Sequence, residues 1–132
     1  MKLTLSDFPS FSFHDSPVRQ ISESEDRIII ALDFAYIRPP IEEAGGKLWK
    51  LSNCSLVCRA VQKNEKEEWT DTVEAREHTT PERPIEEVQH EEVLDGCLAL
   101  SGFTQNNNWG VWRIQAEDFD LAYQERTEIK EG

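Results

Sequence analysis

The chain has 132 residues, with 26 acidic against 14 basic side chains and a formal net charge of −12 at pH 7. This charge argues against nucleic-acid backbones and anionic membranes as partners, because both would repel it. The length and a hydrophobic fraction of 38% are typical of one folded domain rather than a disordered acidic segment. We therefore expect a single domain over 1–132, with 124–132 as a charged C-terminal tail.

The first predicted elements are two strands, over 17–23 and 27–36, joined by a turn at 24–26. In the second strand large apolar side chains stand at every even position, so we expect that face to lie in the core. These side chains are Ile28, Ile30, Leu32, Phe34 and Tyr36. The strand should end at Arg38-Pro39-Pro40, because consecutive prolines cannot donate to a β-ladder.

A long strand is predicted next, over 47–61, but its apolar residues change parity along the way. A bulge or break near Ser52-Asn53 would bring the two halves onto one face. The charged stretch 64–68 reads as a turn, and 68–76 as an edge strand. This order continues a β-rich pattern.

One short helix is predicted after these strands. Thr80 would be its cap and Pro81 would occupy the first turn. Over Pro84–Val93 the apolar residues form only a thin stripe, so a structured acidic loop is the alternative.

A β-hairpin closes the predicted fold. Leu94, Leu98 and Leu100 should share one face of a strand that ends near Gly102-Phe103. An Asn-rich turn at 105–108 leads to the partner strand over 109–116. With six or seven strands in all, the fold class is mainly β, α+β at most. The architecture would be an antiparallel sandwich or a partly open barrel.

The cysteines and the N-terminus together indicate a cytoplasmic protein. Three cysteines are an odd number, which is typical of buried thiols in a reducing compartment rather than a disulfide framework. The N-terminus lacks an apolar segment followed by a small-residue cleavage site, and the longest apolar run is too short to span a bilayer.

Metal ligation has weak support in the sequence. His90, Glu91, Glu92 and Cys97 are ligand types, but they do not match a metal-binding spacing. Cys54 and Cys58 would stand roughly 13 Å apart on a strand, at about 3.3 Å per residue, too far to bind one ion together. We expect no metal and no cofactor.

The run His14-Asp15-Ser16 places three residue types of hydrolase sites side by side. Adjacency in sequence is weak support, because catalytic triads assemble from distant segments. We therefore favour a polar turn before Pro17 as the explanation of the run. The alternative is a small hydrolase or lyase that uses His14 with Asp15 or Asp33 inside a barrel cavity.

Tryptophans offer another alternative, a module for carbohydrates or other small ligands. Trp109 and Trp112 have opposite parity on one strand, so at least one should belong to the core. Trp69 is the tryptophan most suited to partial exposure.

Several acidic runs remain, and they are typical either of a solvated surface or of a patch that attracts a basic protein. A dense group follows the predicted helix start. We expect the contact set to be the carboxylates of Glu86, Glu87, Glu91, Glu92 and Asp95, with Trp69 as an anchor at the rim.

Both ends of the chain resemble a group of small bacterial proteins. The opening Phe13-His14-Asp15-Ser16 with Val18 and Ile21, and the ending around Trp109–Ile114 and Ala116–Phe119, are similar to those of the group. Several members are regarded as immunity proteins of toxin systems, including contact-dependent inhibition. The resemblance implies a cytoplasmic antitoxin that neutralises one toxin domain by steric and electrostatic occlusion, and it implies no catalytic residue.

Overall fold

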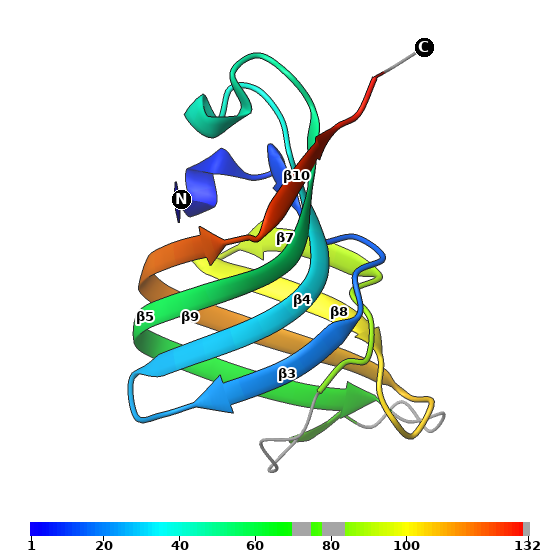
Figure 1. Ribbon diagram of the computed structural model, residues 1–132. Helices are drawn as coiled ribbons and strands as arrows, with labels where there is room; N and C mark the ends of the chain where they lie inside the picture. Colours follow the sequence, from blue (N-terminus) through cyan, green and yellow to red (C-terminus); the bar gives the residue numbers. More distant parts are fainter. Residues whose placement is uncertain (70–74, 78–83, 131–132) are drawn as a thin grey trace.

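The computed structural model describes residues 1–69, 75–77 and 84–130, with only the backbone described for 75–77. Ten antiparallel strands form one sheet that curls into a nearly closed barrel (Figure 1), so the predicted mainly β class and barrel are confirmed. The strands are β1 (Lys2–Leu3), β2 (Phe11–Ser12), β3 (Val18–Glu23), β4 (Arg27–Ile37), β5 (Trp49–Trp69), β6 (Ala75–Glu77), β7 (His90–Leu94), β8 (Cys97–Phe103), β9 (Trp109–Ala122) and β10 (Glu125–Glu128).

The sheet order is β2-β4-β5-β9-β8-β7, with β3 and β10 added on β4 and β5. An extended segment, residues 84–89, closes the barrel between β8 and β3; we call it the seam segment. Its Glu86 N–H donates to the carbonyl of Phe103 at 2.8 Å on one side, and its Glu86 carbonyl accepts from Val18 at 2.9 Å on the other. The seam therefore carries backbone hydrogen bonds to both neighbours.

Two glycines allow the seam segment to cross the ends of β8 and β9. Gly102 and Gly110 are register partners. A Cβ on Gly102 would lie 2.0 Å from the carbonyl oxygen of Glu87, and one on Gly110 would lie 2.3 Å from that of Pro84. Neither position has room for a side chain, so this closure depends on glycine.

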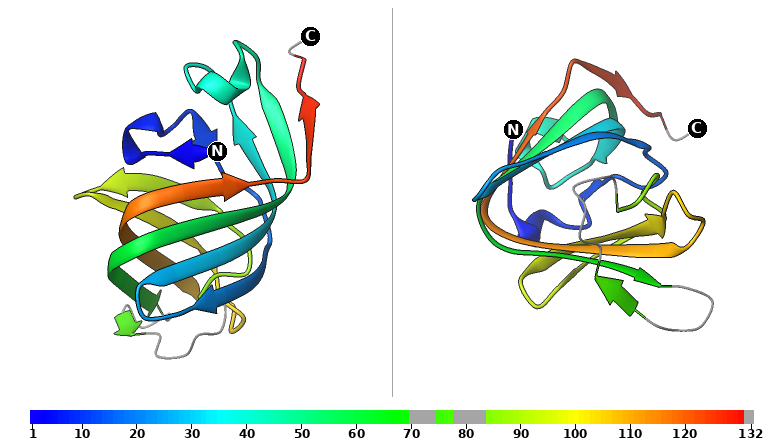
Figure 2. Two further views of the ribbon diagram at one scale, coloured as in Figure 1. Left: turned by 60° about the vertical axis from the view of Figure 1, so that its left-hand side comes forward. Right: turned by 90° about the horizontal axis from the view of Figure 1, so that it is seen from below.

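Apolar side chains fill the inside of the barrel as one cluster. Trp112 is fully buried there and Trp109 is half-buried, which confirms that at least one of the pair belongs to the core. The N-terminal segment lies over one end of the barrel (Figure 2), where Leu3, Phe11 and Phe13 add to the core.

The long strand β5 has two irregularities with positive φ, at Asn53 (+53°) and Ala60 (+52°). The first confirms the predicted break near Ser52-Asn53. β4 and β5 keep one register across it, with Leu32 opposite Cys54 and Phe34 opposite Ser52, so both strands change phase there. Ala35 and Ile37 are buried, while Phe34 and Tyr36 are half-buried on the other face. The prediction that Phe34 and Tyr36 face the core is therefore wrong, because the break reverses the alternation after Leu32.

The predicted turn at 64–68 is wrong, since β5 runs through it to Trp69 and pairs with β9 along the way. The prediction of one edge strand over 68–76 is wrong too. Its described residues belong to two antiparallel strands, because β5 ends at Trp69 and β6 pairs back on β5 with Glu77 opposite Glu67. Residues 70–74 lie outside the described residues.

The predicted helix over Pro84–Val93 is wrong: this stretch is the extended seam segment followed by β7. Its proposed cap, Thr80-Pro81, lies outside the described residues. In the described part of the chain the only helical elements are two 3-10 turns, η1 (Leu5–Asp7) and η2 (Glu42–Ala44). The helical pattern predicted that Ile85 and Val88 would be buried. Both are buried, but the backbone that carries them is extended.

Leu94 does not share a face with Leu98 and Leu100; it belongs to β7 and is 58% exposed. Asp95 and Gly96, with φ of +54° and +76°, form a tight hairpin turn between the two strands. The hairpin of β8 and β9 is confirmed, and so is the turn between β3 and β4. The predicted tail contains strand β10, which pairs with β5.

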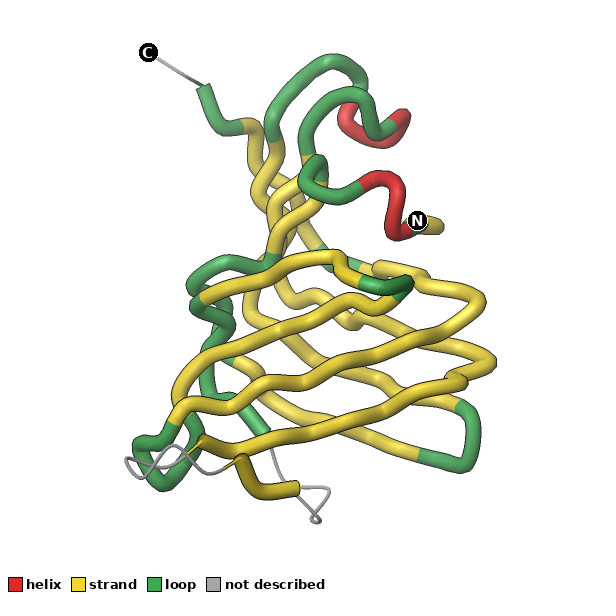
Figure 3. Tube along the Cα trace, turned by 180° about the vertical axis from the view of Figure 1, so that it is seen from behind, coloured by secondary structure: helices red, strands yellow, loops and turns green. Residues whose placement is uncertain are grey.

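The upper ends of β4 and β5, together with β10, rise above the barrel as a separate arm (Figure 3). No helix in the described ranges is long and apolar enough to cross a membrane.

Candidate functional site

In the predicted acidic contact set, the carboxylate of Glu91 bonds to the end of β2 and to the residue that follows it. Both of its oxygens accept the backbone N–H of Phe13, at 3.0 and 3.1 Å, and one also accepts the hydroxyl of Ser12. Burial raises the pKa of this carboxyl, while the bonds from Ser12 and Phe13 lower it. Glu91 therefore ties β7 to β2 and is not a surface contact.

The remaining acids of the set are distributed along the seam segment and β7. Glu86 and Glu87 are half-buried on the seam segment, where the Glu87 carboxylate accepts the amide of Gln89 at 2.9 Å. Glu92 and Asp95 are exposed, and Glu92 points to the side of β7 opposite Glu91 because side chains alternate along a strand. The set is not one compact patch.

Three aromatic side chains lie side by side on the outside of the barrel. Trp69 on β5 is the register partner of Trp109 on β9, and Trp109 is the partner of Phe103 on β8. Cross-strand partners share a face, and this face is opposite the one that buries Trp112. We call Trp69, Trp109 and Phe103 the aromatic row.

The aromatic row is well formed and accessible. The rings of Phe103 and Trp109 pack edge to face, with centroids 5.4 Å apart and planes at 89°. Phe103 is 52% exposed, and it and Leu94 are the exposed large hydrophobic side chains of the described residues. An apolar side chain held open in this way is a usual element of a binding surface.

The row brings Trp69 to the same end of the barrel as Glu86. The Glu86 N–H donates to the carbonyl of Phe103, so a continuous line of hydrogen-bonded strands runs from Trp69 to Glu86. Glu92 and Asp95 lie toward the other end of β8, because Asp95 is in the turn that precedes Cys97. Sequence reasoning missed Phe103 and Trp109 as site residues, although the predicted hairpin ends one strand near Phe103 and begins the next at Trp109.

Other acidic side chains are neutralised within the fold. Arg59 bonds to Asp118 at 2.8 Å and the N-terminal amine bonds to Asp120 at 3.1 Å. These bonds hold the pKa of both carboxyls below the ordinary range. Asp118 and Asp120 are therefore paired within the fold, and the excess negative charge of the protein lies on other residues.

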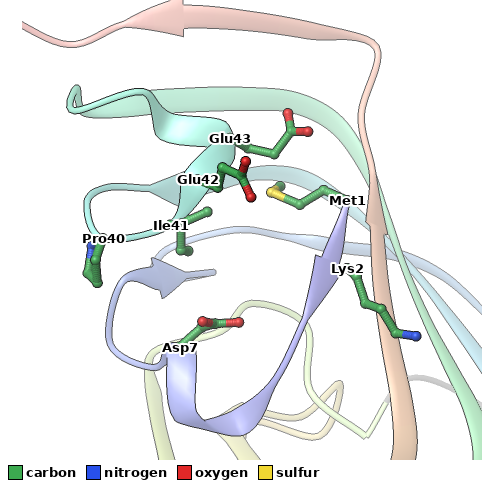
Figure 4. A pocket seen from close by; sticks show the side chains of 7 residues that line it. All are labelled: Met1, Lys2, Asp7, Pro40, Ile41, Glu42 and Glu43. Atoms are coloured by element: carbon green, nitrogen blue, oxygen red, sulfur yellow. The ribbon is translucent and has the colours of Figure 1, made fainter.

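A second acidic region surrounds a hollow of about 620 Å³ beside the N-terminus. Figure 4 shows Glu42 and Glu43 of η2 on one side of it and Asp7 of η1 on the other. The Asp7 carboxylate accepts the N–H of Thr4 at 2.8 Å and so closes its own turn. This region adds to the negative surface.

The His14 run forms a turn. Asp15 has φ of +66°, and the Ser16 hydroxyl accepts the N–H of Phe34 at 3.1 Å. His14 lies 3.4 Å from Asp15, with both side chains more than half exposed. Asp33 is instead paired with Arg19, so the structure does not assemble the predicted catalytic pair inside the barrel.

The thiols are buried and the metal-type ligands do not converge. Burial raises the pKa of Cys54 to about 11 and that of Cys58 to about 12. Within the described ranges no three His, Cys, Asp or Glu side chains are placed to hold a metal ion. Cys97 is buried and unpaired as well.

Comparisons of this chain with models of protein families, with curated proteins and with solved structures found no match.

Proposed function

We propose that this protein is an acidic binding protein that docks onto a basic protein surface, and that its partner is a bacterial toxin domain which it neutralises. The observation that carries the proposal is the aromatic row on the outside of a barrel whose interior is filled. Binding would therefore take place on the outer surface, around Trp69, Trp109 and Phe103.

The composition of this surface fits protein recognition. Aromatic side chains supply large apolar contact area at low cost in conformational entropy, and they dominate the energetics of many interfaces. Phe103 is exposed by 52%, so a partner would remove much of its surface from water. Trp109 supports it from the side.

Charge would act mainly on the rate of association. A chain with net charge −12 attracts a basic partner over distances of about 8 Å at physiological salt, and such steering raises association rates by roughly 10- to 1,000-fold at low salt. Glu86 and Glu87, next to the row, would orient the encounter. Because Glu91 is committed to the fold, it has no part in this mechanism.

Neutralisation of a toxin rests on the resemblance of the two chain ends to immunity proteins. The mechanism would be occlusion: the bound barrel covers the active cleft of the toxin domain. The acidic side chains of this protein would occupy the toxin's cleft, which would be basic because the toxin's substrate is anionic.

The enzyme alternative loses support from the positions of His14 and Asp33. For a carbohydrate module, the row is less suitable than a flat platform, because Phe103 stands edge-on to Trp109 at 89°. A glycan panel read by tryptophan fluorescence tests this second alternative directly.

The matched pair Phe103→Ser and Leu94→Ser tests the proposal, since both remove an exposed apolar side chain from the outer surface. Phe103 ends β8, whereas Leu94 is on β7 opposite the start of β8. Each variant and the wild type are used to capture proteins from a lysate of the native host. We expect one basic protein to be retained by the wild type and Leu94→Ser and lost by Phe103→Ser.

The captured protein is then expressed alone and together with each form of this chain. We expect it to arrest growth alone, and the wild type but not Phe103→Ser to restore growth. A captured protein that is harmless would contradict neutralisation, and equal capture by all three forms would contradict the aromatic row.

A further inference from the structure

We propose a second binding site, on the arm, for a small organic anion that carries a carboxylate or phosphate on an apolar body. This site is separate from the aromatic row and does not depend on the function proposed for it. It consists of two adjoining hollows, of about 340 and 580 Å³, that share Arg38, Leu48 and Ile129. We call them together the arm groove.

The arm groove collects basic side chains on a strongly acidic protein. Arg38, Lys47 and Lys130 line it. Lys47 is paired with Glu128, at 3.8 Å. Within the described residues neither Arg38 nor Lys130 has an ion-pair partner, so two cations remain available.

The acids of the groove do not cancel these cations. Glu128 is already paired with Lys47, and Asp15 is the other acid of the lining, so one carboxylate faces the two cations Arg38 and Lys130. More distant carboxylates are screened, because the Debye length is about 8 Å at physiological salt. An anion in the groove is therefore governed by Arg38 and Lys130.

The backbone around the groove is held in place before any ligand binds. The Arg38 N–H donates to the carbonyl of Ser10 at 2.9 Å, and its guanidinium donates to that of Pro9 at 3.2 Å. On the other wall, the N–H of Ile129 donates to the carbonyl of Leu48 at 2.8 Å. A guanidinium positioned in this way keeps further N–H groups for a bidentate contact with a carboxylate or phosphate.

Apolar and aromatic side chains of the arm groove indicate what the uncharged part of the ligand is. Leu48 and Ile129 are half-buried, and the ring of Tyr36 reaches the same hollow. Binding sites for small molecules commonly combine such a wall with a few fixed polar groups. The ligand class is therefore an anion with a ring or a short apolar chain, rather than a bare inorganic ion.

The test titrates the full chain with phenyl phosphate, benzoate and benzamidine, and follows backbone amide shifts by NMR. The first two probes distinguish phosphate from carboxylate, and benzamidine is a cation of similar shape. We expect at least one of the anions, and not benzamidine, to shift residues of the arm groove in a saturable way.

Two variants locate the binding. Arg38→Gln should weaken the binding of the preferred anion by about 10-fold or more, since charge-assisted hydrogen bonds are lost. Lys63→Gln, on an exposed part of β5 outside the groove, should leave it unchanged. Binding of benzamidine as tight as that of the anions, equal weakening by both variants, or no saturable shift in the groove would overturn the proposal.

Discussion

The carboxylate of Glu91 accepts the backbone N–H of Phe13, whose nitrogen lies 3.0 and 3.1 Å from its two oxygens. A side chain thus joins β7 to the residue that follows β2. Glu91→Ala would leave this buried N–H without an acceptor and should lower the free energy of unfolding by about 1–3 kcal/mol. Urea denaturation measures the loss, and Glu92→Ala on the exposed face should cost far less.

The raised pKa of Glu91 gives a pH dependence of known sign. A carboxyl whose pKa is higher in the folded state contributes stability at low pH, and this contribution is lost as the pH rises through the folded-state pKa. Between the ordinary glutamate pKa and the raised one, the wild type should therefore lose stability relative to Glu91→Gln. Urea titrations at a series of pH values test this, and a gain by the wild type over that window would contradict it.

Gly102 and Gly110 are predicted to be intolerant of any side chain. Gly102→Ala places a methyl group 2.0 Å from the Glu87 carbonyl oxygen, so the seam segment must move, and we expect a loss of about 1–3 kcal/mol. Gly45→Ala is the control, because no atom lies within 4 Å of the Cβ it would add. Only the φ of +57° is unfavourable there, and it should lower the free energy of unfolding by about 1 kcal/mol. Equal effects on urea midpoints would show that the seam segment is not closely packed.

A polar network links β3, β5 and β9 near Trp112. Lys66, 8% exposed, pairs with Glu23 at 2.7 Å, and Asn64 accepts the indole N–H of Trp112 at 2.6 Å. Lys66→Met should lower the free energy of unfolding by about 2–3 kcal/mol, because Glu23 loses its charged partner in a largely buried position and keeps only the amide of Asn64. Adding Glu23→Gln should recover part of this loss, and strictly additive effects in the double-mutant cycle would contradict the coupling.

Cys54 and Cys58 should be chemically inert in the folded protein. Burial and pKa values of about 11 and 12 leave almost no thiolate at pH 8. Mass spectrometry after iodoacetamide treatment should show both unmodified under native conditions and labelled in denaturant. Rapid native labelling at either residue would show that the barrel opens.

The sequence predicts the barrel where local pattern and tertiary environment agree. Strand β4, its hairpin with β3 and the hairpin of β8 and β9 follow from alternation and turn residues. The break at Asn53 could be predicted because Leu51 and Cys54 have opposite parity and both require burial. The matching reversal at Phe34 could not, since it depends on the pairing of β4 with β5.

Other elements depend on partners that are distant in the chain. Asn64–Glu68 is polar on both sides and so resembles a turn, yet Lys66 points inward to meet Glu23. Ile85 and Val88 have helical spacing, but the glycines of β8 and β9 accept an extended segment there. In the candidate site, Trp69 and Glu86 lie at the same end of the barrel, while the inward direction of Glu91 depends on Phe13 and has no local signal.

Association kinetics with the captured partner test the binding role of the aromatic row most directly. Phe103→Ser should raise the dissociation rate about 10-fold or more, while Glu86→Gln/Glu87→Gln should slow association and flatten its salt dependence. Leu94→Ser should change neither rate. Dissociation unaltered in Phe103→Ser, with association unaltered in the double variant, would contradict the account.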